Sequence, residues 1–241
     1  MLHRRLYFLT LITGFGLVSA AQAHYLWIAI DTKSGEHGAT NIYFEESPAP
    51  GDGFYLEPFA ENGRTWIRTI DQPQPAEIKT TEIREPKKRW LTAPLRKAGP
   101  RSVDSYGKFG VYRYGKSTDV LLHYYARCLD VDSHEQLHEL ARAEHLNLDM
   151  VVHDDGADVD VKVLWMRQPA EECTIFIRGP KGFKKNIKTS ENGTARFTPE
   201  AEGRYLLRTN VEEKTPGRDG GKDYSLIRHH ATLSISLPLK K

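Results

Sequence analysis

The sequence predicts an all-β protein made of two β-sandwich domains with one short helix between them. Short stretches of alternating apolar and polar residues recur along the chain, with glycine or proline between them. This period of two is typical of strands that bury one face, and evenly spaced short strands are typical of immunoglobulin-like or prealbumin-like sandwiches. We expect strands over residues 24–31, 40–46, 65–70, 78–84, 109–114, 119–129, 147–153, 159–166, 173–178, 194–198, 203–211 and 224–237.

One segment with helical character interrupts the strands and runs from Ser133 to about Ala143. Ser133 offers an N-cap hydroxyl, and Gln136 three positions later is its capping-box partner. The chain is long enough for two domains. We therefore expect residues 24–144 to form an N-terminal β-sandwich and residues 145–241 to form a C-terminal one. The glycine-rich stretch 215–222 is expected to be a loop before the last strand.

The first 23 residues have the pattern of a secretory signal peptide. Arg4 and Arg5 precede a mostly apolar stretch, which is followed by Ala21-Gln22-Ala23. The apolar stretch is too short to span a bilayer as a helix of the mature protein, and we expect no transmembrane segment after cleavage. These features predict a periplasmic or secreted protein that begins at His24.

The charge and the cysteine content limit the kinds of partner that the protein can bind and the redox compartments that suit it. The whole chain has 34 Lys+Arg and 32 Asp+Glu, and removal of residues 1–23 takes away two arginines and no acid. A neutral mature chain has no basic footprint for nucleic acid. Cys128 and Cys173 could form a disulfide in an oxidising compartment or remain two buried thiols. Two cysteines cannot form a cysteine-rich zinc site.

A histidine at the mature N-terminus is a ready metal ligand. The α-amine and the Nδ1 atom of His24 can close one chelate ring around a metal ion without any folding. Amine and imidazole donors suit Cu(II) and Ni(II). The alternative is that His24 merely follows the cleavage site. His24 is nonetheless the first candidate for metal binding.

Three further histidines are candidate metal ligands. His123 shares a strand face with Tyr125, away from the face that we expect to be the core. His230 alternates with His229 and is expected to face solvent or the other domain, whereas His229 points at a core. His37 lies at a hairpin tip, and a straight strand would put it about 20 Å from His24. Each of them could instead be a structural or merely exposed histidine.

The sequence contains no motif that indicates an enzyme class. A Gly-x-Ser-x-Gly elbow, a phosphate loop and a dinucleotide fingerprint are all missing from it. No two acids stand out as an acid/base pair. His134 and His138 are four residues apart, but we expect them on an exposed amphipathic helix. We therefore predict no catalytic residues.

Several short motifs occur in order along the mature chain: Ala-His-Tyr-Leu-Trp-Ile at 23–28, Tyr-Gly-Lys-Phe-Gly-Val-Tyr at 106–112, Leu-His-Tyr-Tyr-Ala at 122–126, Gly-Arg-Tyr at 203–205 and His-His-Ala-Thr-Leu at 229–233. With them the chain resembles the bacterial exported nickel-uptake family of the substrate-specific-component type (NikM-like). The resemblance implies a β-sandwich that handles nickel or cobalt beside a metal transporter component. This chain lacks the family's transmembrane helices, so it would act as a free periplasmic protein. By position, the resemblance ranks His24 first, His123 second and His230 third.

Three functions follow from these observations. The first is binding or delivery of nickel, cobalt or copper through His24; amine and imidazole donors favour Cu(II) over Ni(II), so metal supply would decide occupancy. The second is a metal-free exported binding or scaffold module. The third is a copper-dependent oxidase in which His24 and a second histidine form a brace. That enzyme needs exposed aromatics on one face, and the sequence does not place Trp27, Trp66 and Trp90 together.

Overall fold

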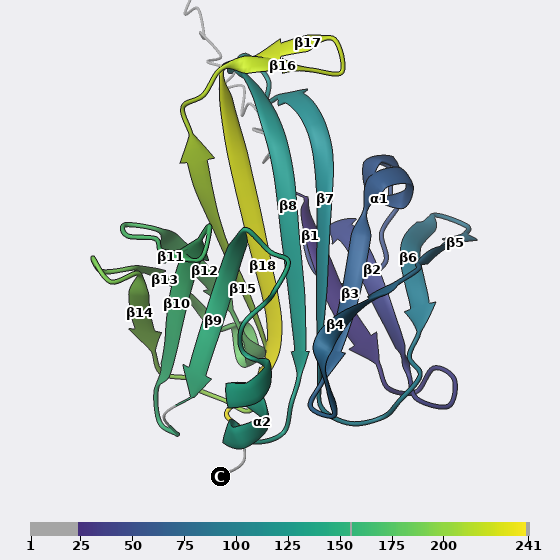
Figure 1. Cartoon of the computed structure of the whole chain (residues 1–241), viewed down its shortest axis with the longest axis vertical. Helices are drawn as coiled ribbons and strands as arrows, with labels where there is room; N and C mark the ends of the chain where they lie inside the picture. Colours follow the sequence, from purple (N-terminus) through teal and green to yellow (C-terminus); the bar gives the residue numbers. More distant parts are fainter. Residues whose placement is uncertain (1–23, 155, 240–241) are drawn as a thin grey trace, which may run out of the picture.

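An eight-stranded sheet runs through the middle of the molecule (Figure 1). In the computed structural model, which describes residues 24–154 and 156–239, its strand order is β13-β12-β15-β18-β8-β7-β3-β4. One smaller sheet contains β1, β2, β6 and β5, and another contains β9, β10, β11 and β14. The predicted all-β sandwich fold is therefore confirmed. The predicted signal peptide, residues 1–23, lies outside the described residues.

The strands and helices have the following bounds: β1 (Tyr25–Asp31), β2 (Ala39–Glu45), α1 (Glu57–Asn62), β3 (Arg64–Thr69), β4 (Gln72–Ile78), β5 (Thr81–Glu85), β6 (Lys88–Pro94), β7 (Arg101–Arg113), β8 (Asp119–Asp130), α2 (His134–Leu140), β9 (Leu148–Asp154), β10 (Val159–Trp165), β11 (Gln168–Pro169), β12 (Thr174–Arg178), a 3-10 turn (Pro180–Gly182), β13 (Lys184–Lys188), β14 (Thr194–Phe197), β15 (Gly203–Glu213), β16 (Gly217–Asp219), β17 (Lys222–Tyr224) and β18 (Leu226–Leu237). Among the residues so described, no helix is long and apolar enough to cross a membrane.

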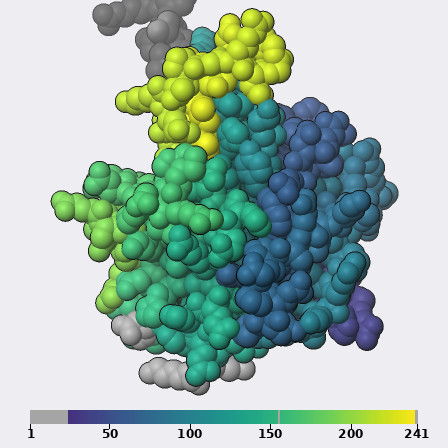
Figure 2. Space-filling model, in the orientation of Figure 1, coloured from purple at the N-terminus to yellow at the C-terminus, as the bar shows by residue number. Residues whose placement is uncertain are grey.

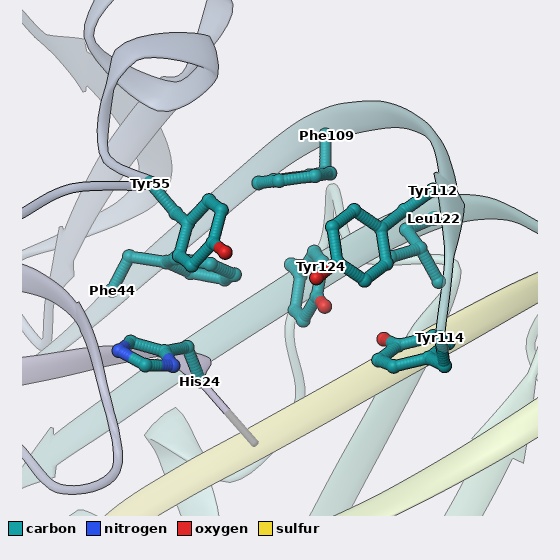
Figure 3. Close-up of a pocket in the computed structure, with 8 residues that line it drawn as sticks. All are labelled: His24, Phe44, Tyr55, Phe109, Tyr112, Tyr114, Leu122 and Tyr124. Atoms are coloured by element: carbon teal, nitrogen blue, oxygen red, sulfur yellow. The ribbon is translucent and has the colours of Figure 1, made fainter. Parts of the chain in front are cut away.

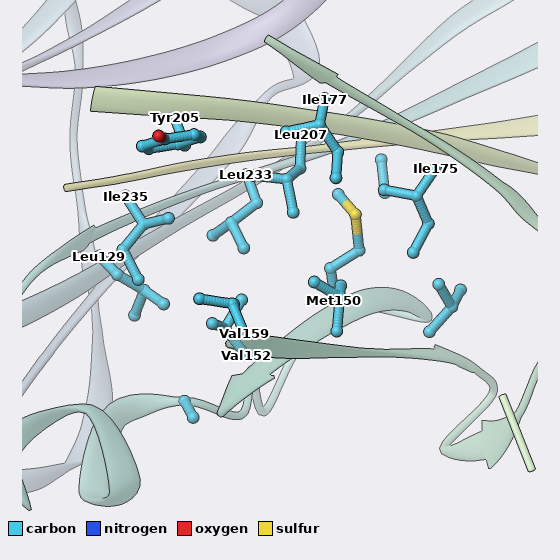
Figure 4. Packing of buried hydrophobic residues seen from close by; sticks show 14 of the residues in the cluster. Leu129, Met150, Val152, Val159, Ile175, Ile177, Tyr205, Leu207, Leu233 and Ile235 are labelled. Carbon is cyan, nitrogen blue, oxygen red and sulfur yellow. The ribbon is translucent and has the colours of Figure 1, made fainter. Parts of the chain in front are cut away.

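Two hydrophobic cores form on the two faces of strand β8. Successive side chains of a strand point to opposite faces. Leu122 and Tyr124 accordingly belong to the core under β1 and β2, whereas Tyr125 and Leu129 belong to the core under β9 and β10. Figure 4 shows part of the second core, where mainly aliphatic side chains of both sheets pack together with Tyr205. The central sheet is thus shared between two sandwiches.

This arrangement corrects one expectation from the sequence. The face of β8 that carries His123, Tyr125 and Arg127 was expected to lie away from any core. Tyr125 and Arg127 are each only 2% exposed. The reason is that a second sheet covers this face, which strand alternation alone cannot reveal.

The last strand joins the two halves of the chain. Strand β18 pairs antiparallel with β15 and parallel with β8, where His229 lies opposite His123. Hydrogen bonding therefore continues across the predicted boundary between residues 144 and 145. That boundary itself stays a prediction, but the two parts contribute neighbouring strands to one sheet.

Arg127 ties the end of helix α2 to the central sheet. Its guanidinium lies 3.0 Å from Asp149 and 3.2 Å from Asp104, and it donates hydrogen bonds to the carbonyls of Leu140 and Ala141. The last carbonyls of a helix have no partner within the helix. A buried arginine satisfies them here and is itself neutralised by two carboxylates.

The local signals at helix α2 are confirmed. The Ser133 hydroxyl accepts a hydrogen bond from the backbone N–H of Gln136, as an N-cap should. The Gln136 side chain in turn accepts from the N–H of Asp132 at 2.8 Å. The reciprocal pair explains why the helix starts at this point.

Several other segments differ from the expectations: β6 and β13 were not predicted, and the strand expected over 78–84 is interrupted by the turn between β4 and β5. Helix α1 (Glu57–Asn62) was not predicted, and its Phe59 is buried against β7 beside Gly107. The expected loop 215–222 contains β16 and the turn of the β16–β17 hairpin, whose residues Gly220 and Gly221 have positive φ angles of 54° and 80°. Glycine adopts such angles without steric cost, so this turn can be tight. Figures 1 and 2 show the hairpin projecting at one end of the molecule.

The two cysteines are free and buried in the structure. Cys128 lies in the core beneath β1, and Cys173 lies in the other core. The central sheet separates the cores, which settles the alternative that the sequence left open in favour of two thiols.

Candidate functional site

A pocket lined mainly by aromatic side chains lies at the start of strand β1. Figure 3 shows the side chains around it, with His24 and Tyr114 on opposite sides. Phe44 is central: its ring lies 5.5 Å from that of Phe109 and 4.9 Å from that of Tyr124. Strands β2, β7 and β8 all contribute to the lining, and the two residues from β8, Leu122 and Tyr124, alternate along that strand. The lining residues are His24, Phe44, Tyr55, Phe109, Tyr112, Tyr114, Leu122 and Tyr124.

His24 lies beside a carboxylate at this pocket. Its Nε2 atom is 3.5 Å from Oε2 of Glu45, and the two side chains are 21% and 15% exposed. Oε1 of Glu45 accepts a hydrogen bond of 3.2 Å from the backbone N–H of Gly53. A Cβ at Gly51 would lie 2.3 Å from the Glu45 carboxyl group, so a larger residue there would displace that carboxyl group. The loop after β2 therefore holds the carboxylate against the imidazole.

Apart from His24, the polar groups of the lining are tyrosine hydroxyls, which carry no charge. A hydrogen bond to Tyr55 raises the pKa of Tyr112. Burial raises the pKa of Tyr114 and puts the pKa of Tyr124, with which it forms a hydrogen bond, well above its usual range. These phenols stay protonated at neutral pH. The pocket therefore offers aromatic faces, hydroxyl groups and one imidazole with its carboxylate.

His230 lies behind the pocket wall and is buried. Its ring stacks on Tyr124 at 4.9 Å and meets the edge of Tyr25 at 5.4 Å. Burial, followed by the charge of Arg228, lowers the pKa of His230 to about 3. Its Nε2 atom is buried with no hydrogen-bond partner among the described residues. His230 was expected to face either solvent or the other half of the chain. It does not face solvent, and its ring packs against Tyr25 and Tyr124 of the other half.

His123 lies on the opposite face of β8 from this pocket. Its Nδ1 atom is 2.8 Å from the Tyr106 hydroxyl, and its ring stacks on His229 at 5.1 Å. Burial, followed by the nearby His229, lowers the pKa of His123 to about 4. His229 itself contacts Glu213 at 2.7 Å and the Tyr125 hydroxyl at 3.2 Å. Both ring nitrogens of His229 therefore have partners, in accord with its expected structural role.

His37 lies in the turn between β1 and β2, at the end of the hairpin away from His24. Its Nε2 atom is 3.6 Å from the carboxylate of Glu36, and its carbonyl accepts a hydrogen bond from Arg101. Over residues 24–154 and 156–239, no three His, Cys, Asp or Glu side chains gather in a group that could hold a metal ion. The four candidate histidines thus have four separate surroundings, and a metal role for each stays a prediction.

Sequence reasoning did not find Glu45 or the tyrosine lining. The register of the β1–β2 hairpin pairs Tyr25 with Glu45, which places Glu45 next to His24. That pairing follows from a hairpin loop over 32–38, centred on Gly35, and could have been counted from the sequence once this centre was chosen. The contributions of β7 and β8 could not, because they depend on how the sheets pack.

Comparison with known proteins leaves the chain without an assigned family. No family model matches it, and no curated protein matches it. Among solved structures, it is similar to a biofilm-associated protein BSP domain at 9% identity, over 87% of this chain and 51% of that one, with a TM-score of 0.22. It is also similar to the FN1–FN3 domains of chicken CNTN1 at 7% identity, over 88% and 66%, with a TM-score of 0.19. The chain spans about half of the first structure.

Proposed function

We propose that this chain is an exported protein that binds a transition metal ion through the histidine at its mature N-terminus and delivers it. The cargo is copper or nickel, with cobalt as the third candidate. The observation that carries the proposal is the position of His24. The residue that signal cleavage would make the first lies partly exposed at a pocket, 3.5 Å from a carboxylate.

The donor set at His24 fits such an ion. Metal-bound histidines usually donate their second ring N–H to a carboxylate or carbonyl, which fixes the tautomer. An Nε2–H group directed at Glu45 places the ring's lone pair on Nδ1, the nitrogen that can chelate together with the α-amine. Amine and imidazole nitrogens suit Cu(II) and Ni(II). Glu45 would thus orient the ligand, and cleavage after Ala23 would complete it.

An incomplete donor set favours delivery over permanent storage. The described residues gather no group of three His, Cys, Asp or Glu side chains at this place. Two nitrogen donors would leave coordination positions open for water or for a ligand from another protein. A metal transporter component is the partner that this exchange calls for.

The test is native mass spectrometry of protein exported from a bacterial host and titrated with Cu(II) or Ni(II). We expect a mass that begins at His24 and one bound metal ion. His24→Ala should lose most of this binding, and Glu45→Gln should weaken it about 10- to 100-fold, the usual effect of removing such a carboxylate. His138→Ala, on helix α2, is the matched control and should bind as the wild type does. A mature mass that begins elsewhere, or equal binding by His24→Ala, would refute the proposal.

A metal-free binding module is the second candidate, and the lining of the pocket favours it. Aromatic faces with neutral hydroxyl groups suit a small apolar or aromatic ligand without any metal. Protein that retains no metal after correct cleavage, yet still binds such a ligand in the pocket, would support this alternative.

A further inference from the structure

A second cavity lies at the other end of strand β1 from His24. Its volume is about 230 Å³, and Ile30, Arg204 and Ser234 are among the residues that line it. Ile30 is six positions after His24 along an extended strand, which corresponds to about 20 Å. The cavity is therefore separate from the aromatic pocket. It lies where the β1–β2 hairpin meets the ends of β8, β15 and β18.

The cavity wall contains a polar group with no partner. Ser234 is 1% exposed, and its hydroxyl has no hydrogen-bond partner among the described residues. A buried hydroxyl without a partner costs free energy, and most native buried groups are satisfied. A hydroxyl can rotate toward a partner that enters the cavity.

Arg204, an exposed residue near the start of β15, supplies a positive charge at the edge of the same cavity. No ion pair engages its guanidinium within the described part of the chain. Burial raises the pKa of the neighbouring Cys128 thiol to about 12, and the Arg204 charge opposes that shift. The acid in the wall, Asp130, is already paired with Arg101 at 2.9 Å.

We propose that this cavity binds a small organic acid. Its carboxylate would be held by the guanidinium of Arg204 and the hydroxyl of Ser234, because a planar guanidinium matches a carboxylate with two parallel hydrogen bonds. Its apolar body would pack against Ile30 and Cys128, whose side chains belong to the core on the same face of the central sheet as Ser234. A cavity of about 230 Å³ suits a short acid rather than a long-chain one.

Isothermal titration calorimetry of the mature full chain with pentanoate tests this site. Pentanamide, an uncharged analogue of similar size, is the control ligand. We expect saturable binding of pentanoate at least tenfold tighter than that of pentanamide. Arg204→Gln should weaken pentanoate binding about tenfold or more, the usual effect of losing a charge-assisted hydrogen bond. Arg178→Gln, an exposed arginine of neighbouring strand β12, should leave it unchanged.

Ser234→Ala separates a binding role from a structural one. Without ligand this variant should have a higher melting temperature, because an unpartnered buried hydroxyl is gone. With pentanoate its affinity should fall about 2- to 10-fold. A higher melting temperature with unchanged affinity would overturn the assignment. So would equal binding by Arg204→Gln, the absence of saturable binding, or inorganic phosphate binding as tightly as pentanoate.

Discussion

His230 shows what a single buried histidine does to the behaviour of this chain. It lies between Tyr25 and Tyr124, and its pKa is lowered to about 3, against an ordinary value of 6.5. The folded protein therefore holds the neutral ring where the unfolded chain would bind a proton. Stability is independent of this group above pH 6.5, falls as the pH drops from 6.5 toward 3, and levels off below that.

We expect His230→Phe to weaken this pH dependence. Phenylalanine keeps an aromatic ring between the two tyrosines and cannot be protonated. The loss of stability between pH 7 and pH 5, measured by urea unfolding at both values, should be smaller in the variant than in the wild type. His138→Phe on helix α2 is the comparison, and its loss should equal that of the wild type. Equal losses in His230→Phe and the wild type would contradict the lowered pKa.

Helix α2, strand β8 and strand β9 are held together by one buried arginine. Arg127 is 2% exposed and reaches two helix carbonyls and two carboxylates. Burial raises the pKa of Asp104, and the Arg127 charge opposes that shift. Removal of the arginine would leave two carboxylates and two carbonyls buried without their partner.

Arg127→Met should therefore lower the free energy of unfolding by about 3–5 kcal/mol, the usual cost of breaking a buried ion pair. Arg113→Met, which breaks an exposed pair with Asp119, should cost much less because water screens that pair. Urea unfolding of both variants at pH 7 measures the difference. A loss in Arg127→Met no larger than in Arg113→Met would show that the buried network contributes little.

Because of the order of the strands, the stability of the whole molecule depends on its last strand, β18. Strand β18 lies between β15 and β8, and side chains of β18 such as Leu233 and Ile235 belong to the core under β9 and β10. A fragment of residues 24–144 would lack this strand and would expose one edge and one face of β8. An exposed, long apolar edge strand is prone to aggregate.

We expect the fragment 24–144 to unfold at lower urea than the chain of residues 24–241, or to aggregate. Addition of a separate fragment 145–241 should restore part of the lost stability, because it supplies β18. Circular dichroism during urea unfolding, with each fragment alone and with both together, checks this. A fragment 24–144 that unfolds cooperatively at the full chain's midpoint would instead favour two independent domains.

Local chemistry determined much of this protein from the sequence alone. Alternation of apolar residues predicts most strands, and Ser133 with Gln136 predicts the start of helix α2, because both signals act between near neighbours. The signal-peptide pattern of residues 1–23, with a histidine directly after it, made His24 the first candidate for metal binding. These inferences need no knowledge of how the sheets pack.

Only the tertiary structure decided what surrounds each of these residues. It buried both faces of β8, put Cys128 and Cys173 in different cores, and set His123 and His230 on opposite faces of one sheet. It also brought Glu45 and the tyrosines of distant strands to His24. The physical reason is that strand alternation fixes two faces but not what covers them. Strand order and sheet packing, which join residues far apart in the chain, decide that.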